Sequence, residues 1–361
     1  MQEHHPFQTI HEALGARFAE VGGRPVPRSY GDTAAEYEAI RSGAGLVDRS
    51  DRIPFRVYGR DPVKILHGLV TNDLAGAPDG QGVYAALLTP KGRMLADLRL
   101  FRRAAGDVLV DVDAGALDNV LATFKKYVPP LFARYELLDG ELRVLGVYGP
   151  DARELVGRVV GEAIPAGLAE DAFVCVDDEG HELLIARTEY TGDEGYDIYA
   201  PVGVAERLWH ALVEAGARPV GHATLDVLRI EAGRPRWGTE LDDSVFPLEA
   251  GLRDRAISTT KGCYTGQEVI IRILHRGRVN WHLRGLLLGD APVPARGTQL
   301  FRTGEDKPVG RITSACESPR HGQAVALGYV RREVEPPAVL RLGAGDGPEV
   351  RVFELPLPIG A

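Results

Sequence analysis

Apolar and polar residues alternate over many short stretches of the first 200 residues, and this period of two predicts β-strands. The clearest stretches cover residues 55–59, 93–101, 142–149 and 181–187. Apolar residues three and four positions apart predict helices between them, over 61–70, 115–128 and 202–216. Strands and helices mix without a regular alternation, which predicts an α+β fold.

The last 80 residues follow a different pattern. Short apolar runs such as PVGRITSA and AVALGYV are separated by Gly- and Pro-containing turns, and no helical spacing interrupts them. Short strands in such a series are typical of a small barrel. We therefore expect a separate all-β domain that starts near Asn280.

Composition narrows the classes of function. The chain has 361 residues, 44% of them hydrophobic, and a net charge of −9, so we expect no nucleic-acid partner. Its three cysteines form no C-x-x-C pair and its ten histidines no metal-binding pattern, so we expect no metal site. No apolar run reaches about 18 residues and no leader-like start is present, which predicts a cytoplasmic protein without a membrane partner.

The segment TTKGCYTGQEVIIRILHRG, residues 259–277, contains the first candidate for chemistry. TGQE matches the capping box S/T-x-x-E and predicts a helix that Thr265 caps. Cys263 would then lie just before a helix N-terminus, where free N–H groups and the nearby Lys261 favour a thiolate. The alternative is that TGQE is only a helix cap and that Cys263 is a small buried apolar residue.

A second candidate lies on the predicted strand RMLADLRLF. Alternation places Asp97 on one face together with Arg93 and Arg99, away from the apolar face. The two arginines would keep the carboxylate ionised. Asp97 could then accept a proton, hold a cationic ligand or form only a surface ion pair.

The third candidate combines two segments. In TEYTGDEGYDIYAP, an acidic turn precedes a strand on which Asp197 alternates away from Tyr196. The segment ATLDVLRIEAG predicts a helix that carries Arg229 and ends at Gly233. Asp197 and Arg229 could converge on a ligand, or the segments could be a structural turn and a snorkelling arginine.

These segments together resemble the family that unites the glycine-cleavage aminomethyltransferase, or T-protein (GcvT), with the folate-binding YgfZ proteins of iron–sulfur cluster maintenance. TGDEGYDIYAP is similar to the T-protein stretch T-G-E-D-G-Y-E-I, and LRIEAGRPRWGTELD is similar to L-R-L-E-A-G-x-P-x-Y-G-x-E-L-D. GRITSACESPRHGQAVALGYV resembles its C-terminal barrel.

The resemblance implies an α+β fold of three domains in a cloverleaf. The first domain would comprise residues 1–54 and 143–245, and the second would comprise residues 55–142 and 246–279 with the cysteine motif. The third would be a β-barrel over residues 280–361. The two α+β domains are thus interleaved along the chain.

The resemblance also implies a site for tetrahydrofolate or another reduced folate. T-proteins have two adjacent acidic residues on this strand, and Asp97 matches the second of them. This second acid looks like the essential carboxylate of the family. Asp197 stands where the family has a pterin-contacting glutamate, and the matching arginine is Arg229. A pterin ring can stack on an aromatic side chain, and an anionic tail needs guanidinium groups. The candidates are Tyr84, Tyr196 and Trp237 for the ring and Arg229, Arg341 and Arg351 for the tail.

Two branches of the family remain open. The residues Lys261, Gly262, Cys263, Tyr264, Gly266, Gln267 and Glu268 match the YgfZ motif K-G-C-Y-x-G-Q-E. The main hypothesis is therefore a folate-binding accessory protein for iron–sulfur cluster assembly or repair, with Cys263 as its functional thiol and iron–sulfur enzymes as clients. The alternative is a folate-dependent aminomethyltransferase or demethylase that uses Asp97. A folate-binding module without chemistry is a third class.

Overall fold

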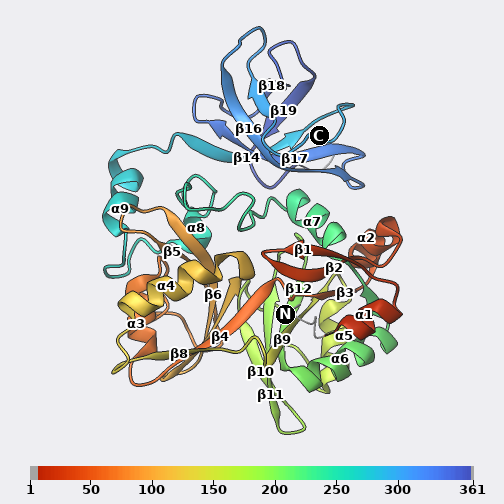
Figure 1. Ribbon diagram of the computed structural model, residues 1–361, viewed down its shortest axis with the longest axis vertical. Coiled ribbons are helices and arrows are strands. Elements are labelled where there is room, and N and C mark those ends of the chain that lie inside the picture. The colour runs from red at the N-terminus through yellow and green to blue at the C-terminus, as the bar shows by residue number, and fades with distance from the viewer. Residues whose placement is uncertain (1–6, 359–361) are drawn as a thin grey trace. The chain divides into compact units, whose positions relative to one another are not determined.

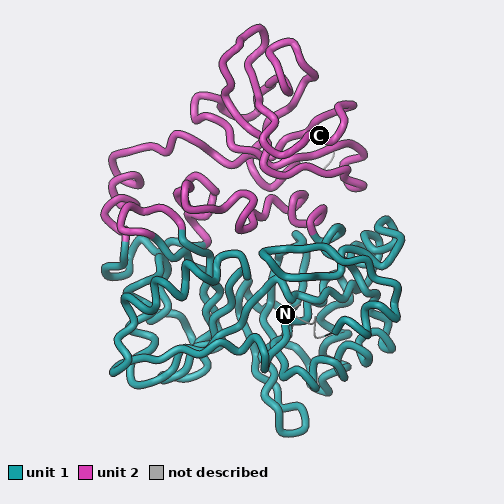
Figure 2. Tube along the Cα trace, in the orientation of Figure 1, with its two compact units in different colours: residues 1–88, 95–225, 256–265 teal, residues 89–94, 226–255, 266–361 magenta. Residues whose placement is uncertain are grey.

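The computed structural model describes residues 7–358 (Figure 1). The chain divides into two compact units (Figure 2). Unit 1 consists of residues 1–88, 95–225 and 256–265, and unit 2 of residues 89–94, 226–255 and 266–361. Within residues 7–358, none of the helices combines the length and apolar character that a membrane crossing requires.

The first sheet of unit 1 has six strands in the order β10-β11-β12-β9-β3-β13. β13 pairs with β3 in parallel, and the other pairs are antiparallel. Helices α5 and α6 pack on this sheet through apolar side chains such as Leu208, Trp209 and Leu212 (Figure 1). The elements of this part are α1 (Gln8–Ala13), α2 (Thr33–Ser42), β3 (Gly45–Asp48), β9 (Leu142–Tyr148), α5 (Ala152–Val160), β10 (Phe173–Asp178), β11 (His181–Thr188), β12 (Gly195–Pro201), α6 (Val202–Glu214) and β13 (Arg218–Pro219).

The second sheet of unit 1 has five strands in the order β5-β6-β7-β4-β8. A shared apolar cluster, which includes Phe101 from this sheet and Tyr199 from the first, joins the two sheets. A separate hairpin of β1 (Arg17–Val21) and β2 (Arg24–Ser29) completes the strands of unit 1. The elements around the second sheet are β4 (Arg52–Tyr58), α3 (Pro62–Leu69), β5 (Val83–Leu88), β6 (Met94–Ala104), β7 (Asp107–Asp113), the 3₁₀ turn η1 (Ala114–Ala116), α4 (Leu117–Tyr127) and β8 (Arg134–Leu137).

Unit 2 contains a closed barrel with the strand order β14-β17-β16-β15-β18-β19. Its interior is filled by apolar side chains such as Leu286, Ile312 and Val330. The strands are β14 (Trp281–Leu287), β15 (Gln299–Phe301), β16 (Pro308–Ser318), β17 (Gln323–Arg331), β18 (Ala338–Leu342) and β19 (Glu349–Phe353). The remaining helices are α7 (His222–Glu231), which begins in unit 1, α8 (Arg253–Ala256) and α9 (Gln267–Arg276).

The predicted α+β fold with a C-terminal barrel is confirmed, and the helix predicted around Arg229 is present as α7. Gly233 follows it with a φ of 69°, as a helix-ending glycine should. The residue bounds of the three predicted domains stay a prediction.

The predicted capping box is wrong. Helix α9 begins at Gln267, its N-cap is Gly266 with a φ of 82°, and no side chain caps it. A Cβ on Gly266 would lie 2.6 Å from the carbonyl oxygen of Thr89. The absence of a side chain at Gly266 therefore allows these two backbone segments to approach closely at the start of the helix, and Thr265 lies outside the helix.

Candidate functional site

Asp97 is the carboxylate with an open hydrogen-bonding position. Its side chain lies on β6 and is 7% exposed. One oxygen, Oδ2, accepts a hydrogen bond of 3.1 Å from the Tyr84 hydroxyl. The other, Oδ1, is buried and accepts no hydrogen bond from any residue between 7 and 358. Since a buried carboxylate oxygen without a donor is costly, Asp97 is ready to accept one from a ligand.

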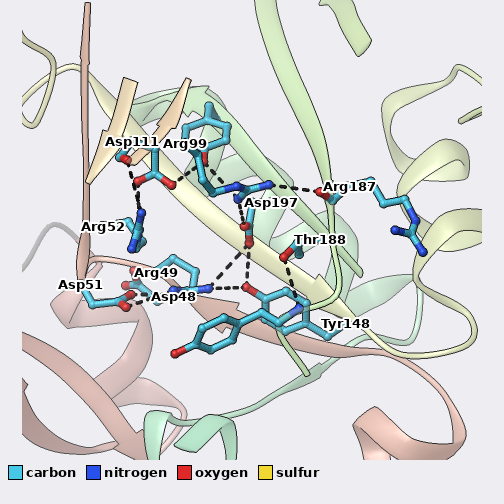
Figure 3. Close-up of polar contacts among 12 residues, drawn as sticks. Asp48, Arg49, Asp51, Arg52, Arg99, Asp111, Tyr148, Arg187, Thr188 and Asp197 are labelled. Carbon is cyan, nitrogen blue, oxygen red and sulfur yellow. Dashed lines mark hydrogen bonds and ion pairs between the residues drawn. The ribbon is translucent and has the colours of Figure 1, made fainter. Parts of the chain in front are cut away.

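Asp197, on β12, is in the opposite state, because both of its oxygens are occupied (Figure 3). Oδ2 accepts a hydrogen bond of 2.5 Å from Arg99 Nη1, and Oδ1 accepts one of 2.6 Å from the Tyr148 hydroxyl. The predicted convergence of Asp197 with Arg229 on a ligand stays a prediction, because the two residues lie in different units. The guanidinium that meets Asp197 comes from β6, in the neighbouring sheet of unit 1.

Arg99 is held on three sides. Its Nε donates to Asp171 Oδ1 at 2.8 Å, its Nη1 to Asp197, and its Nη2 to the carbonyl oxygen of Arg187 at 3.1 Å. The side chain is 6% exposed. Burial alone would lower the pKa of Arg99, but Tyr199 and the surrounding aspartates outweigh it and raise the pKa well above its ordinary value.

A second arginine extends the network beyond Tyr148. Arg49 Nη1 donates to the Tyr148 hydroxyl at 2.7 Å, and Nε and Nη2 bind the two oxygens of Asp51 at 2.9 and 3.1 Å. Burial tends to raise the pKa of Asp51, but Arg49 and His222 hold it below its ordinary value. Burial raises the pKa of Tyr148, so this residue stays a phenol that donates to Asp197.

A third arginine completes the charged cluster. Arg52 Nε donates to Asp111 Oδ1 at 3.0 Å, and the Tyr199 hydroxyl donates to Asp111 Oδ2 at 2.8 Å. We use the name charged cluster for Arg49, Asp51, Arg52, Asp97, Arg99, Asp111, Asp113, Asp171 and Asp197. Six carboxyl groups thus face three guanidinium groups, and this excess of acid favours either a retained proton or a cationic ligand.

The other predicted ligand contacts differ in burial. The Tyr196 ring is fully buried in the apolar core of the first sheet, so it offers no face to a ligand. Arg229 is 1% exposed and donates to Asp226, Glu240 and Ser314 in unit 2. Trp237 lies in unit 2 and is partly exposed, and the tail candidates Arg341 and Arg351 lie on β18 and β19 of the barrel.

The cysteine motif separates into residues with different roles. Cys263 is exposed, whereas Lys261 turns its ammonium group to the end of α3 and donates to the carbonyl oxygens of His67, Val70 and Asn72. These acceptors close the C-terminal turn of a helix. Lys261 thus has a structural role, and its service as a cation for Cys263 stays a prediction.

The sequence indicated part of this site. Alternation on the strand 93–101 placed Asp97 and Arg99 on one face, and both are indeed there. Arg49, Asp171 and Tyr148 were not predicted, because each lies more than 45 positions along the chain from Asp97 and carries no local motif. Asp171 has a φ of 65°, which is unusual for a residue other than glycine. This feature is visible only in the structure and could not have been found in the sequence.

Comparison with known proteins assigns the chain to a family. A model of the GCVT N-terminal domain matches residues 7–261, and a model of the glycine cleavage T-protein C-terminal barrel domain matches residues 282–352. The chain belongs to the GCVT family.

Relatives in this family have similar lengths. An aminomethyltransferase of Rubrobacter xylanophilus is 33% identical over 98% of this chain and 91% of its own length. One of Bacillus subtilis is 29% identical over 91% of each chain. The crystal structure of aminomethyltransferase T from the glycine cleavage system of Bartonella henselae superposes with a TM-score of 0.89 at 26% identity, covering 98% of this chain and 97% of that one.

These GCVT relatives favour the transferase alternative over the iron–sulfur hypothesis, since all three are named as aminomethyltransferases. The family uses tetrahydrofolate as substrate and cofactor. The open oxygen of Asp97 fits one donor of such a substrate. Each oxygen of Asp197 already accepts one hydrogen bond, from Arg99 or from Tyr148, and its predicted pterin contact stays a prediction.

Proposed function

We propose that this protein is a folate-dependent aminomethyltransferase in which Asp97 holds the reacting amine. One observation carries the proposal: Asp97 is buried, hydrogen-bonded by Tyr84 on one oxygen and open on the other. The family relationship supplies the reaction class, and the open carboxylate supplies a position at which a nitrogen-bearing substrate can be held.

The surroundings make Asp97 suited to an amine. In a buried site of low dielectric, a carboxylate attracts an ammonium group more strongly than it does in water. The excess of carboxyl groups in the charged cluster increases this attraction. Tyr84 fixes the orientation of the carboxylate, so that Oδ1 can bind a protonated amine or take a proton from it. Tetrahydrofolate, when bound, supplies the nitrogen that receives the one-carbon unit.

The test is formation of methylenetetrahydrofolate from tetrahydrofolate and a panel of aminomethyl donors. We expect turnover by the parent and a loss of about 100-fold or more in Asp97→Asn, because the amide keeps the shape but not the charge. Asp254→Asn, the same change at an exposed surface position, is the matched control and should keep parental activity. Turnover by Asp97→Asn equal to that of the control would remove Asp97 from the reaction.

One feature supports the iron–sulfur hypothesis as a second candidate. Cys263 is exposed within a motif that resembles the YgfZ signature, so its thiol is available to a client protein. The test is complementation of a deletion strain by Cys263→Ser, with the activities of iron–sulfur enzymes as the readout. Full complementation by the serine variant would argue for the transferase alone. A cytoplasmic location is part of either proposal.

A further inference from the structure

The structure contains a slot that is shaped for a guanidinium group and filled by the chain itself. The slot is bounded by the carboxylates of Asp171 and Asp197 and by the carbonyl oxygen of Arg187. Arg99 fills it and lies two residues after Asp97 on the same face of β6. These two side chains thus have different hydrogen-bonding states. Asp97 has an oxygen that can accept a hydrogen bond from a ligand, whereas Arg99 already donates to carboxylates of the protein.

The contacts of Arg99 define what the slot recognises. Asp197 accepts a hydrogen bond from Nη1, and Asp171 accepts one from Nε. The two carboxylates therefore bind two N–H groups of one planar N–C–N unit. A pterin presents a similar edge, formed by its ring N–H and its exocyclic amino group. Arg99 therefore offers Asp197 the same type of donor that the 2-aminopyrimidinone part of a pterin would offer.

The Arg99 guanidinium and a pterin edge differ in charge, and this difference determines which of them donates to Asp197. Arg99 is a full cation between two buried carboxylates, whereas the pterin edge is neutral. Removing the cation would take the counter-charge from Asp171 and leave Asp197 with only the longer ion pair to Arg49, at 3.9 Å. Arg99 is also tethered to the site, so it competes at a high effective concentration. A neutral pterin edge cannot displace it, and because Asp197 is only 3% exposed, the remaining lone pairs of its oxygens are not open to a ligand either.

We propose that Arg99 is a specificity-determining residue that closes the Asp197 carboxylate to ligands, so that Asp97 anchors the substrate without help from Asp197. This inference rests on the proposed function, because it concerns how that same site selects its substrate. It predicts that the folate ring is not recognised through Asp197 in the parent protein.

The test is the affinity for tetrahydrofolate, measured by calorimetry under anaerobic conditions, of the parent and of Arg99→Ala. Removing the guanidinium frees the Asp197 oxygen, so we expect binding about 10-fold tighter than that of the parent. The gain should disappear in the double variant Arg99→Ala/Asp197→Asn. Arg49→Ala is the matched control, since it removes the more distant guanidinium, 3.9 Å from Asp197 Oδ1, but leaves Arg99 hydrogen-bonded to Asp197, and it should show no gain.

A second readout tests the slot itself. Guanidinium chloride at a few tens of millimolar should raise the melting temperature of Arg99→Ala, whereas sodium chloride at the same concentration should not. If Arg99→Ala stays unfolded even with guanidinium, Arg99→Met is measured instead, because methionine fills much of the same space but carries neither the charge nor the donors that hold Asp197. This variant should also bind tetrahydrofolate more tightly than the parent.

The outcomes separate this inference from the proposed function. A folded Arg99→Ala protein that binds tetrahydrofolate no more tightly than the parent overturns the role of Arg99, and so does an equal gain in the double variant. In both cases, turnover that depends on Asp97 leaves the proposed function intact. If neither the parent nor any Arg99 variant binds tetrahydrofolate, the proposed function fails and the inference fails with it.

Discussion

Arg52 on β4 and Asp113 on β7 are direct partners across neighbouring strands, and Asp97 on β6 lies one position beyond the Leu98–Val112 pair. Asp97, Asp113 and Arg52 therefore form one row across the second sheet. Burial raises the pKa of Asp113 to about 7 against the opposing effect of Arg52, and Asp51 and Asp97 add to the rise. Part of the excess acid in the charged cluster is thus neutralised by a proton near neutral pH.

This proton predicts how stability depends on pH. The folded protein binds it more tightly than the unfolded chain, in which the pKa is near the ordinary 3.8. The stabilisation is complete below pH 3.8 and is lost as the pH rises to about 7. Asp113→Asn cannot titrate, so its free energy of unfolding should rise relative to that of the parent by up to about 1.4 kcal/mol per pH unit across this window. Urea unfolding at several pH values measures the difference, and parallel curves would contradict the assignment.

Because one oxygen of buried Asp97 has no hydrogen-bond donor, we expect this residue to lower the stability of the folded protein while it serves the reaction. Asp97→Asn keeps an acceptor for Tyr84 but removes a buried charge from a cluster with too many carboxylates. Weaker attraction to Arg52 opposes this gain without cancelling it, because more aspartates than arginines surround the position. We expect the free energy of unfolding to rise by about 1 kcal/mol at pH 7, while transferase activity falls. A clear loss of stability in chemical denaturation would show that the charge of Asp97 is needed for the fold.

Two glycines of the cysteine motif should respond differently to the same substitution. Gly266 has a φ of 82°, and an added Cβ would lie 2.6 Å from the Thr89 carbonyl oxygen. Gly266→Ala should therefore destabilise the protein by about 2 kcal/mol or more. Gly262 has open space around its Cα, so Gly262→Ala should be close to neutral and serves as the control. Melting temperatures measure both, and equal shifts would show that the close approach to Thr89 does not require a glycine at the start of α9.

The three cysteines should differ in their rates of alkylation. Cys175 and Cys263 are both exposed, and Cys316 is half-buried. Partial burial of the thiol, together with Glu182, nevertheless raises the pKa of Cys175 to about 11, and burial with Glu231 raises the pKa of Cys316 further above its ordinary value. Exposed Cys263 should therefore react with iodoacetamide at least about 10-fold faster than either at neutral pH, as peptide mass spectrometry can follow.

The structural role of Lys261 adds a test to this measurement. Lys261→Met removes the donor to the end of α3, so it should lower the free energy of unfolding by about 1 to 3 kcal/mol. It should leave the alkylation rate of Cys263 within about twofold of that in the parent. A rate that falls about 10-fold in folded Lys261→Met would instead support Lys261 as the cation that activates the thiol.

Local patterns in the sequence determined the elements and their faces. Alternation over 93–101 placed Asp97 and Arg99 on one side of β6, and helical spacing with Gly233 at its end predicted α7. The series of short strands after residue 280 predicted the barrel. Each of these features depends on neighbours within one strand or one helical turn, so the order of residues is sufficient to define it.

The partners of the charged side chains were decided only by the tertiary structure. Asp197 pairs with Arg99 across 98 positions of sequence, and Lys261 caps α3 across 191 positions from the carbonyl oxygen of Val70. The sequence offers Asp197 many arginines, including the predicted Arg229, and nothing local distinguishes them. Burial selects the partner, because once the two sheets of unit 1 pack together, Asp197 is enclosed and takes the donor that Arg99 of the neighbouring sheet places within reach.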